Sequence, residues 1–207
     1  GYMSLPLCVA SKILNIKLIL FEPNMVLGRS NKLFIKSCEE ILCYSDKLKN
    51  FPSEHRNKIN VIPSLLRKKF YDAKKADTIN QHINLLVIGG SQGAKIFDKL
   101  IKTSVIELSK KYNLKIYQQT NLANFAILAK FYKDNNINFE LFDFNEDILN
   151  LMGKANICLT RAGASTLAEL VFLNVPYVAI PLPTSKDNHQ FENAFFYNKI
   201  GCNWILN

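Results

Sequence analysis

Hydrophobic positions follow two alternating patterns along the second half of the chain. Short continuous apolar runs, typical of buried strands, alternate with segments in which apolar residues recur at helical spacing. The runs expected to form strands cover residues 84–88, 114–118, 139–144, 155–160 and 176–180. The segments expected to form helices cover residues 97–108, 125–132, a short stretch from about 146, 166–173 and 190–199. Strands that alternate with helices predict an α/β fold with parallel βαβ units in a doubly wound, Rossmann-like sheet.

The first half of the chain resembles the tail of another α/β unit. Helical spacing occurs at residues 4–14 and 30–36, and strand-like runs occur at 17–21 and 41–45. The stretch that follows this half is polar, charged and aperiodic, which is typical of a linker. We expect a partial N-terminal α/β domain, truncated before its first strand, then a linker and a C-terminal ligand-binding domain, at residues 1–66, 67–82 and 83–207.

A glycine-rich turn follows the first strand of the second half. The spacing of Gly89, Gly90 and Gly93 matches neither a Walker A loop nor the dinucleotide-binding fingerprint. A strand that enters this turn and leaves as a helix presents free backbone N–H groups, which favour a bound phosphate. Ser91 and Gln92 could add side-chain hydrogen bonds. The alternative is a tight strand-to-helix connection that needs glycine only for its dihedral angles.

The loop after the strand at 155–160 offers a second set of candidate residues. Gly163 and Ala164 are small enough for a ligand to approach the main chain, and Arg161 supplies a positive charge. Thr166 and Glu169 have the spacing of a capping box, which is what the local pattern favours, since helical periodicity places Glu169 off the buried face. The other interpretation is that the Glu169 carboxylate accepts hydrogen bonds from the vicinal hydroxyls of a ribose.

A third loop, residues 181–188, follows the strand at 176–180. Asp187 or Asn188 could be the N-cap of the next helix. The functional interpretation places His189 and Gln190, at the start of that helix, toward a polyhydroxylated ligand. Because ligands bind outside the carboxyl ends of the strands in doubly wound sheets, the three loops converge on one edge. Together they predict a nucleotide-sugar site.

Composition limits the partners and cofactors of this site. The net charge of +9 and the pI of about 9.3 favour anionic partners. The lysines are scattered without interleaved aromatic residues, so we expect no nucleic-acid partner. The five cysteines include no C-x-x-C pair, which favours reduced thiols. The sequence shows no cluster of metal-ligating residues, and we expect neither a metal nor a cofactor. No apolar run approaches the roughly 18 residues of a membrane span.

Three motifs, in this order and spacing, resemble the MurG family of bacterial glycosyltransferases: GGSQGA at 89–94, RAGASTLAEL at 161–170 and KDNHQFENA at 186–194. The segments GYMSLP and FEPNMVLGRSNK are similar to the later part of that family's N-terminal domain. The resemblance covers essentially the whole chain. It implies a two-domain glycosyltransferase fold of the GT-B type, with the sugar nucleotide bound mainly by the C-terminal domain.

The resemblance also implies a reaction and a location. The family moves N-acetylglucosamine from UDP-N-acetylglucosamine to undecaprenyl-pyrophosphoryl-muramyl-pentapeptide in peptidoglycan synthesis. It inverts the anomeric centre and needs no tightly bound metal. We therefore expect a peripheral enzyme on the cytoplasmic face of the bacterial inner membrane, where a basic surface would suit anionic lipid headgroups.

The resemblance assigns the diphosphate of the donor to two of the loops and to the first residue of the expected linker. Ser91 and Gln92, with the turn's backbone, would lie by the diphosphate and the sugar. Arg67 would neutralise the diphosphate leaving group. The backbone at Ala164 and Ser165 would meet the sugar or the diphosphate. Such groups favour departure of UDP because they stabilise charge that grows in the transition state.

The resemblance assigns other residues to the hydroxyls of the sugar and of the ribose. Glu169 would hold the ribose hydroxyls, in contrast to the capping box that the local pattern favours. His189 and Gln190 would bind the sugar hydroxyls, and Asn24 would reach across from the first domain.

Several departures from the family bear on activity. Residues 21–24 read Phe-Glu-Pro-Asn where the family usually has His-Glu-Gln-Asn, and residues 63–65 read Pro-Ser-Leu where it has Gly-Asn-Pro. His189 replaces the first of a usual Gln-Gln pair. The glycine-rich N-terminal loop with the presumed catalytic base is absent, as is the last helix, so the catalytic residue is unassigned. We expect this chain to bind the donor with weak or no transfer activity.

Two other functions stay open at this point. The chain could be a non-catalytic nucleotide-sugar binding module, which the missing N-terminal loop would favour. It could also be a related UDP-sugar enzyme, such as a transferase with another acceptor or an epimerase, because epimerases share this type of sheet. A dehydrogenase is disfavoured, since the dinucleotide fingerprint is missing.

Overall fold

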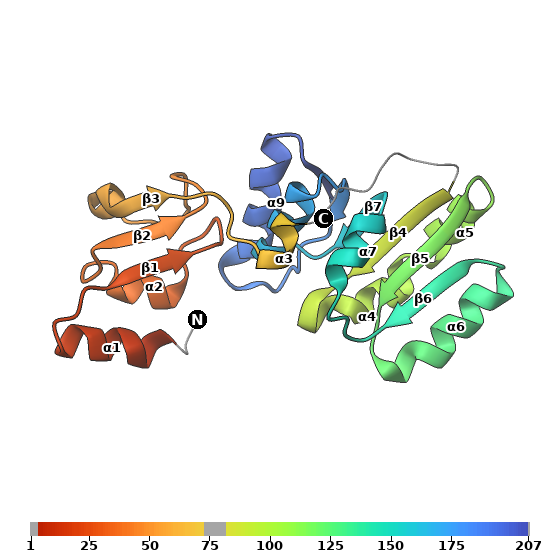
Figure 1. The fold of residues 1–207 in the computed structure, drawn as a ribbon, viewed down its shortest axis with the longest axis horizontal. Coiled ribbons are helices and arrows are strands. Elements are labelled where there is room, and N and C mark those ends of the chain that lie inside the picture. The colour runs from red at the N-terminus through yellow and green to blue at the C-terminus, as the bar shows by residue number, and fades with distance from the viewer. Residues whose placement is uncertain (1–3, 73–81, 207) are drawn as a thin grey trace.

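The computed structural model describes residues 4–72 and 82–206, apart from the side chains of residues 91–94, and it contains two lobes with one parallel sheet each (Figure 1). In the first lobe the strand order is β1-β2-β3. Its strands are β1 (Ile19–Glu22), β2 (Glu40–Cys43) and β3 (Ile59–Val61). Its helices are α1 (Leu5–Ile13), α2 (Arg29–Phe34) and the 3-10 helix η2 (Ser53–Lys58).

The second lobe contains a six-stranded sheet in the order β6-β5-β4-β7-β8-β9, with all neighbours parallel. The strands are β4 (His82–Ile88), β5 (Asn113–Gln119), β6 (Asn138–Phe142), β7 (Ile157–Thr160), β8 (Tyr177–Ala179) and β9 (Asn203–Ile205). The strand order reverses direction at β4, which has β5 on one side and β7 on the other. This is the predicted doubly wound arrangement, and ligands bind at such switch points.

Helices cover both faces of this sheet. The α-helices are α3 (Lys68–Tyr71), α4 (Gly90–Leu100), α5 (Lys102–Ser109), α6 (Phe125–Asp134), α7 (Ile148–Lys154), α8 (Ala164–Phe172) and α9 (His189–Lys199). The 3-10 helices are η3 (Leu122–Asn124) and η4 (Lys186–Asn188). None of the helices among the described residues has both the length and the apolar character that crossing a membrane requires.

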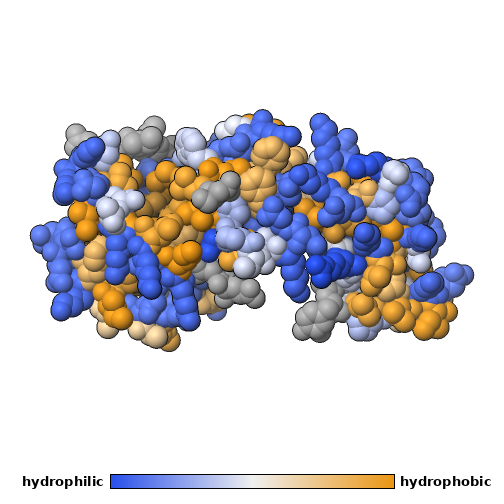
Figure 2. Space-filling view, turned by 180° about the vertical axis from the view of Figure 1, so that it is seen from behind, coloured by the Kyte–Doolittle hydropathy of each residue, from blue (hydrophilic) through white to orange (hydrophobic). Residues whose placement is uncertain are grey.

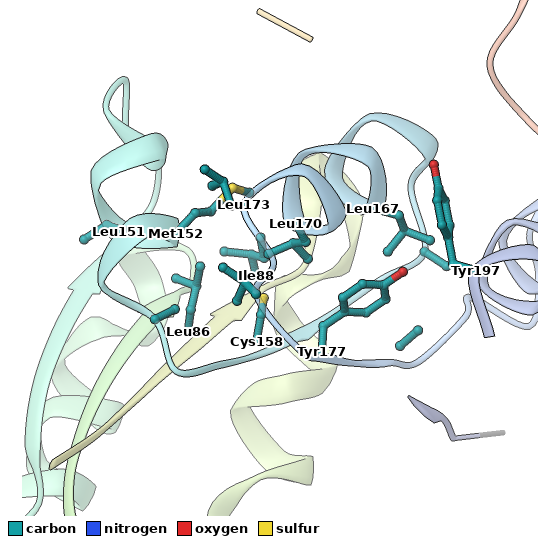
Figure 3. Packing of buried hydrophobic residues seen from close by; sticks show 14 of the residues in the cluster. Leu86, Ile88, Leu151, Met152, Cys158, Leu167, Leu170, Leu173, Tyr177 and Tyr197 are labelled. Atoms are coloured by element: carbon teal, nitrogen blue, oxygen red, sulfur yellow. The ribbon is translucent and has the colours of Figure 1, made fainter. Parts of the chain in front are cut away.

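Alternate residues of β4 supply the two cores of the second lobe, because successive side chains of a strand point to opposite faces. Leu85 and Val87 pack with residues of α4, α5 and α6. Leu86 and Ile88 pack with residues of α7, α8 and α9, as the close view in Figure 3 shows. A strand that is buried on both faces has a continuous apolar run in its sequence, and for this reason β4 could be predicted.

The first lobe has a smaller core of its own. Its fully buried members include Ile41 and Cys43 of β2, which pack with residues of α1 and α2. Other apolar side chains of α1 are exposed, with Leu7 71% and Ile13 76% accessible. Figure 2 shows hydrophobic residues gathered at the lower end of the first lobe. The surface of this lobe at α1 is therefore largely apolar.

The structure departs from the sequence expectations in several strands and helices. The strands β3 and β9, each of three residues, had not been predicted because such short runs carry little pattern. The expected long helix after the glycine turn is divided into α4 and α5 at Ile101. The strand expected at 139–144 ends at Phe142. The division into domains at 1–66, 67–82 and 83–207 stays a prediction.

The stretch that was predicted to be an aperiodic linker contains α3. Its Phe70 is completely buried and belongs to the core cluster around β4 and α8. The guanidinium of Arg67 lies over the Phe70 ring, 4.9 Å from its centroid. One helical turn with a single apolar anchor has no periodicity to detect, so the sequence pattern missed it.

Replacing Phe70 with Ala is expected to lower the free energy of unfolding of the second lobe by about 3–5 kcal/mol, because the change removes a buried ring and leaves a cavity. Urea unfolding followed by circular dichroism measures this. Lys68→Ala, at an exposed position of the same helix, is the matched control and should change stability by less than about 0.5 kcal/mol. Equal stabilities of the two variants would contradict the assignment of Phe70 to the core.

Candidate functional site

A cavity of about 300 Å³ opens at the carboxyl edge of the second sheet, beside the switch point at β4. Its walls come from the ends of β4, β5 and β6, from α7 and α8, and from the residue before α3. The lining residues are Arg67, Ile88, Gly90, Gln119, Phe142, Phe144, Asn145, Glu146, Ile148, Met152, Thr166 and Glu169. The cavity thus has an apolar wall of aromatic and aliphatic side chains and an ion pair on the α8 side.

The glycine turn borders this cavity. Gly90 has a φ of +63°, in the left-handed region that favours glycine, and a Cβ at this position would meet nothing within 4 Å. Gly90 is therefore required for its backbone conformation rather than for space. The Gly89 N–H donates to Gln119 Oε1 at 3.2 Å, and Gln119 Nε2 donates to the Asp143 carbonyl at 3.1 Å. Gln119 thereby ties the turn to the loop that follows β6.

The N-terminus of α4 begins at this turn, as predicted. The side chains of Ser91 and Gln92, and the surroundings of Gly93, lie outside the described residues. Binding of a phosphate at this turn stays a prediction. The position of the turn at the N-terminus of α4 supports it, because the helix dipole and free N–H groups there favour an anion.

Arg67 and Glu169 form an ion pair at the cavity wall. The Arg67 Nε and Nη2 atoms each lie 3.0 Å from Glu169 Oε1. The Glu169 side chain is 9% accessible, whereas the Arg67 side chain is 49% accessible. A buried carboxylate is stabilised by such a partner because burial alone would penalise its charge. The structure brings together two residues that the resemblance had assigned to the same ligand.

The local interpretation of Glu169 as part of a capping box was wrong. Gly163, in an extended conformation, is the N-cap residue of α8, so Thr166 is the third residue of the helix rather than its cap. Glu169 is also on the buried face of α8, not off it as periodicity indicated. The burial is possible because Arg67 lies opposite and supplies the compensating charge.

The two influences on the pKa of Glu169 oppose one another. Burial, the larger, raises the pKa of this carboxyl, while the charge and hydrogen bond of Arg67, followed by the charge of Lys69, lower it. The net pKa lies above the ordinary value. Because folding raises its pKa, the Glu169 carboxyl contributes to the stability of the fold at pH values below its unfolded-state pKa. This contribution is lost as the pH rises through its folded-state pKa.

Arg161 is buried in the loop between β7 and α8. Its Nη1 donates to the carbonyls of Ile180 and Pro181 at 2.9 and 3.0 Å, and its guanidinium lies 5.4 Å from the Phe97 ring centroid. Burial lowers the pKa of this guanidinium. Its Nε has no hydrogen-bond partner among the described residues. Arg161 therefore holds the ends of β7 and β8 together, and a direct contact with a ligand stays a prediction.

The small residues predicted beside Arg161 lie at the start of α8. Gly163 and Ala164 are half-buried and Ser165 is exposed. They precede Thr166 by one helical turn or less and Glu169 by one to two turns, and both of these residues line the cavity. A ligand that extended from the cavity along α8 would meet the backbone of these residues.

His189 and Gln190 are the first two residues of α9, and both side chains contact the preceding loop. Gln190 Oε1 accepts from the Leu182 N–H at 2.8 Å, and His189 Nδ1 lies 2.7 Å from the Lys186 carbonyl oxygen. Asn188 occupies the predicted N-cap position, but it has a left-handed conformation and makes no side-chain cap hydrogen bond. Both His189 and Gln190 lie outside the lining of the cavity.

Asn24 lies at the contact between the two lobes. Its Nδ2 donates to Glu22 Oε1 at 3.0 Å, and its Oδ1 accepts from Asn193 Nδ2 at 3.0 Å. Asn193 belongs to α9 and also donates to the Ala162 carbonyl at 3.1 Å. Through Asn193, Asn24 is joined to the loop that carries the small residues, although Asn24 does not line the cavity.

The sequence analysis missed the apolar wall of the cavity. Phe144 is 79% accessible, which is unusual for a large aromatic side chain, and it lines the cavity together with Ile88, Phe142, Ile148 and Met152. The expected strand had included Phe144, so its position in a loop at the sheet edge went unrecognised. An aromatic residue just beyond a strand's carboxyl end was the available signal. Such a wall suits a planar heterocyclic ring.

Within residues 4–72 and 82–206, no three His, Cys, Asp or Glu side chains are grouped so that they could hold a metal ion. The charged residues among the described lining of the cavity are Arg67, Glu146 and Glu169.

Comparison with known proteins gives consistent matches. Residues 84–207 match the family described as Glycosyltransferase family 28 C-terminal domain. The whole chain is 64% identical to the UDP-N-acetylglucosamine--N-acetylmuramyl-(pentapeptide) pyrophosphoryl-undecaprenol N-acetylglucosamine transferase of Pelagibacter ubique (strain HTCC1062), of which it covers 58%. It is 34% identical over 211 residues to the protein of the same name from Rickettsia canadensis (strain McKiel), of which it covers 60%.

Solved structures agree with these relatives. MurG of Acinetobacter baumannii aligns over the whole chain with a TM-score of 0.78 and 27% identity, and the match covers 58% of that structure. A glycosyltransferase of kitacinnamycin aligns with a TM-score of 0.64 at 14% identity over 99% of this chain and 61% of that one, which supports the fold alone. The chain thus spans less than two thirds of the length of the relatives that it matches.

Removal of the Arg67 charge is expected to raise the pKa of Glu169 further, because the carboxyl stays buried while its main counter-charge is lost. NMR titration of the Glu169 carboxyl carbon in Arg67→Ala and in the wild-type chain measures this. Lys69→Ala is the control and should raise the pKa less, since Lys69 is the smaller influence. A pKa that is unchanged or lower in Arg67→Ala would show that the ion pair does not form in solution.

Proposed function

The chain belongs to glycosyltransferase family 28, and we propose that it binds UDP-N-acetylglucosamine at the cavity beside β4. The GT-B type fold that the sequence predicted is confirmed by the MurG structure and by the parallel sheets. The MurG resemblance is likewise confirmed by the 64% identity over the whole chain. These matches support a nucleotide sugar as the ligand of the site.

We propose that the protein to which this chain corresponds transfers N-acetylglucosamine to a lipid-linked muramyl-pentapeptide. The names of the relatives give this reaction for them, and the high identity supports the same donor and acceptor here. A peripheral position at an anionic membrane surface fits an acceptor of this kind. The net charge of +9 supports it, since basic residues near such a surface are attracted to its headgroups.

The observation that carries the proposal is the ion pair at the wall of an otherwise largely apolar cavity. The uracil ring would lie against Phe144 and the neighbouring aliphatic side chains. The ribose hydroxyls would donate to the Glu169 carboxylate, as vicinal hydroxyls do to acidic residues in comparable folds. The diphosphate would lie toward the N-terminus of α4, where backbone N–H groups and the helix dipole favour negative charge.

Binding of the donor in this way would exchange the ion pair for contacts with the ligand. When the ribose hydroxyls donate to Glu169, Arg67 can turn its guanidinium toward the diphosphate. Arg67 and the start of α4 would then stabilise the negative charge that grows on UDP as the glycosidic bond breaks. The described residues thereby contribute donor binding and leaving-group stabilisation.

Glu169→Gln is expected to weaken UDP-N-acetylglucosamine binding roughly 10- to 100-fold, because the ribose hydroxyls lose a charged acceptor. Calorimetric titration of the full chain measures this, with GDP-mannose as the competing nucleotide sugar. Glu107→Gln, which removes an exposed carboxylate on α5, is the control and should bind as the wild-type chain does. Equal affinity for the two nucleotide sugars, or unchanged binding by Glu169→Gln, would contradict the proposed site.

A further inference from the structure

The segment that contains η4 and the start of α9 contacts the first lobe at three positions. Arg29 donates to both carboxylate oxygens of Asp187 at 3.1 and 3.2 Å, and Lys49 Nζ lies 2.6 Å from Glu192 Oε1. The basic partners of these two pairs are largely exposed, so each pair contributes little to holding the lobes. The third contact is made by Asn193, which is only 1% accessible.

The Asn193 amide is shared between the two lobes. Its Oδ1 accepts from the Met25 N–H at 2.9 Å, and its Nδ2 donates to Asn24 Oδ1 at 3.0 Å and to the Ala162 carbonyl at 3.1 Å. The Met25 N–H can only donate and the Ala162 carbonyl can only accept, so the orientation of the amide is determined. Both hydrogens of Nδ2 are used, which leaves this amide no free donor for a ligand.

The Asn24 side chain is in turn fixed by hydrogen bonds to Glu22, which is 3% accessible. Glu22 Oε1 accepts from the backbone N–H and from Nδ2 of Asn24 at 3.2 and 3.0 Å, while Oε2 accepts from the Gly28 N–H at 2.7 Å. A Cβ at position 28 would lie 2.8 Å from this oxygen. The Asn24 amide therefore directs its oxygen toward Asn193. A continuous set of hydrogen bonds runs from Glu22 through Asn24 and Asn193 to Ala162.

We propose that Asn193 is a positioning residue that sets the Asn24 loop of the first lobe against the loop at 161–165, and so determines the selectivity of the donor site for the sugar. This inference rests on the proposed function. The nucleotide would occupy the cavity, whose lining includes neither Asn193 nor Asn24. The sugar would extend beyond it toward the start of α8 and α9, the elements that Asn193 joins to the first lobe.

If Asn193 is a positioning residue, its substitution should weaken the binding of the sugar part of the donor more than the binding of the nucleotide part. Asn193→Asp keeps the size and the acceptor for Met25 but replaces the donor to Asn24 and Ala162 with a second oxygen. We expect it to weaken UDP-N-acetylglucosamine binding roughly tenfold while UDP binding by the same variant changes less than about twofold. A residue that only holds the fold together would weaken both ligands or neither.

Calorimetric titration with UDP-N-acetylglucosamine and with UDP tests this. Arg29→Ala removes another contact between the lobes and is the control, expected to bind both ligands as the wild-type chain does. Asn193→Ala is the second variant, should Asn193→Asp fail to fold, and must show the same selective loss. Asn24→Ala combined with either Asn193 variant should lose no more affinity for the nucleotide sugar than Asn24→Ala alone, since Asn193 acts through Asn24.

Equal losses for the two ligands, an unchanged preference for the nucleotide sugar, or additive losses in the double variant would each overturn the inference. These outcomes require a wild-type chain that binds both ligands, so they leave the proposed function intact. A wild-type chain that binds neither ligand would overturn the proposed function, and the inference with it.

Discussion

The site depends on one constraint of the fold, which is that six parallel strands end at the same edge of their sheet. In such a sheet every connection after a strand begins at that edge, and the reversal of strand order at β4 leaves a crevice there. The glycine turn, the loop after β6 and the start of α8 meet at this crevice for that reason. Residues far apart in the sequence, such as Arg67 and Glu169, can then line a single cavity.

The Arg67–Glu169 ion pair explains how a carboxylate can be kept buried at the cavity wall. Burial raises the pKa of Glu169 and so opposes its charge, while the nearby guanidinium and the backing Phe70 ring keep the pair in place. A ligand that replaces this pair must offer hydroxyl donors to one side and anionic oxygens to the other. A ribose linked to a diphosphate has both in the required order, and for this reason we propose a nucleotide as the ligand.

Much of the fold and part of the site could be predicted from sequence, because strands buried on both faces leave a strong local pattern. The doubly wound sheet and the convergence of loops followed from that pattern. The burial of Glu169 could not be foreseen, since it depends on Arg67, which lies 102 residues away in the chain. Likewise, the contact between Asn193 and Asn24 joins residues 169 positions apart. Phe144 was missed because the end of its strand was placed two residues too late.

A crystal structure of the chain with UDP-N-acetylglucosamine would test whether the Arg67–Glu169 pair marks the nucleotide site. A nucleotide site at this pair predicts the uracil ring against Phe144, the ribose hydroxyls on the Glu169 carboxylate and the Arg67 guanidinium turned from Glu169 to the diphosphate. A nucleotide bound elsewhere, or one bound at the cavity with the ion pair still closed and the ribose away from Glu169, would contradict it.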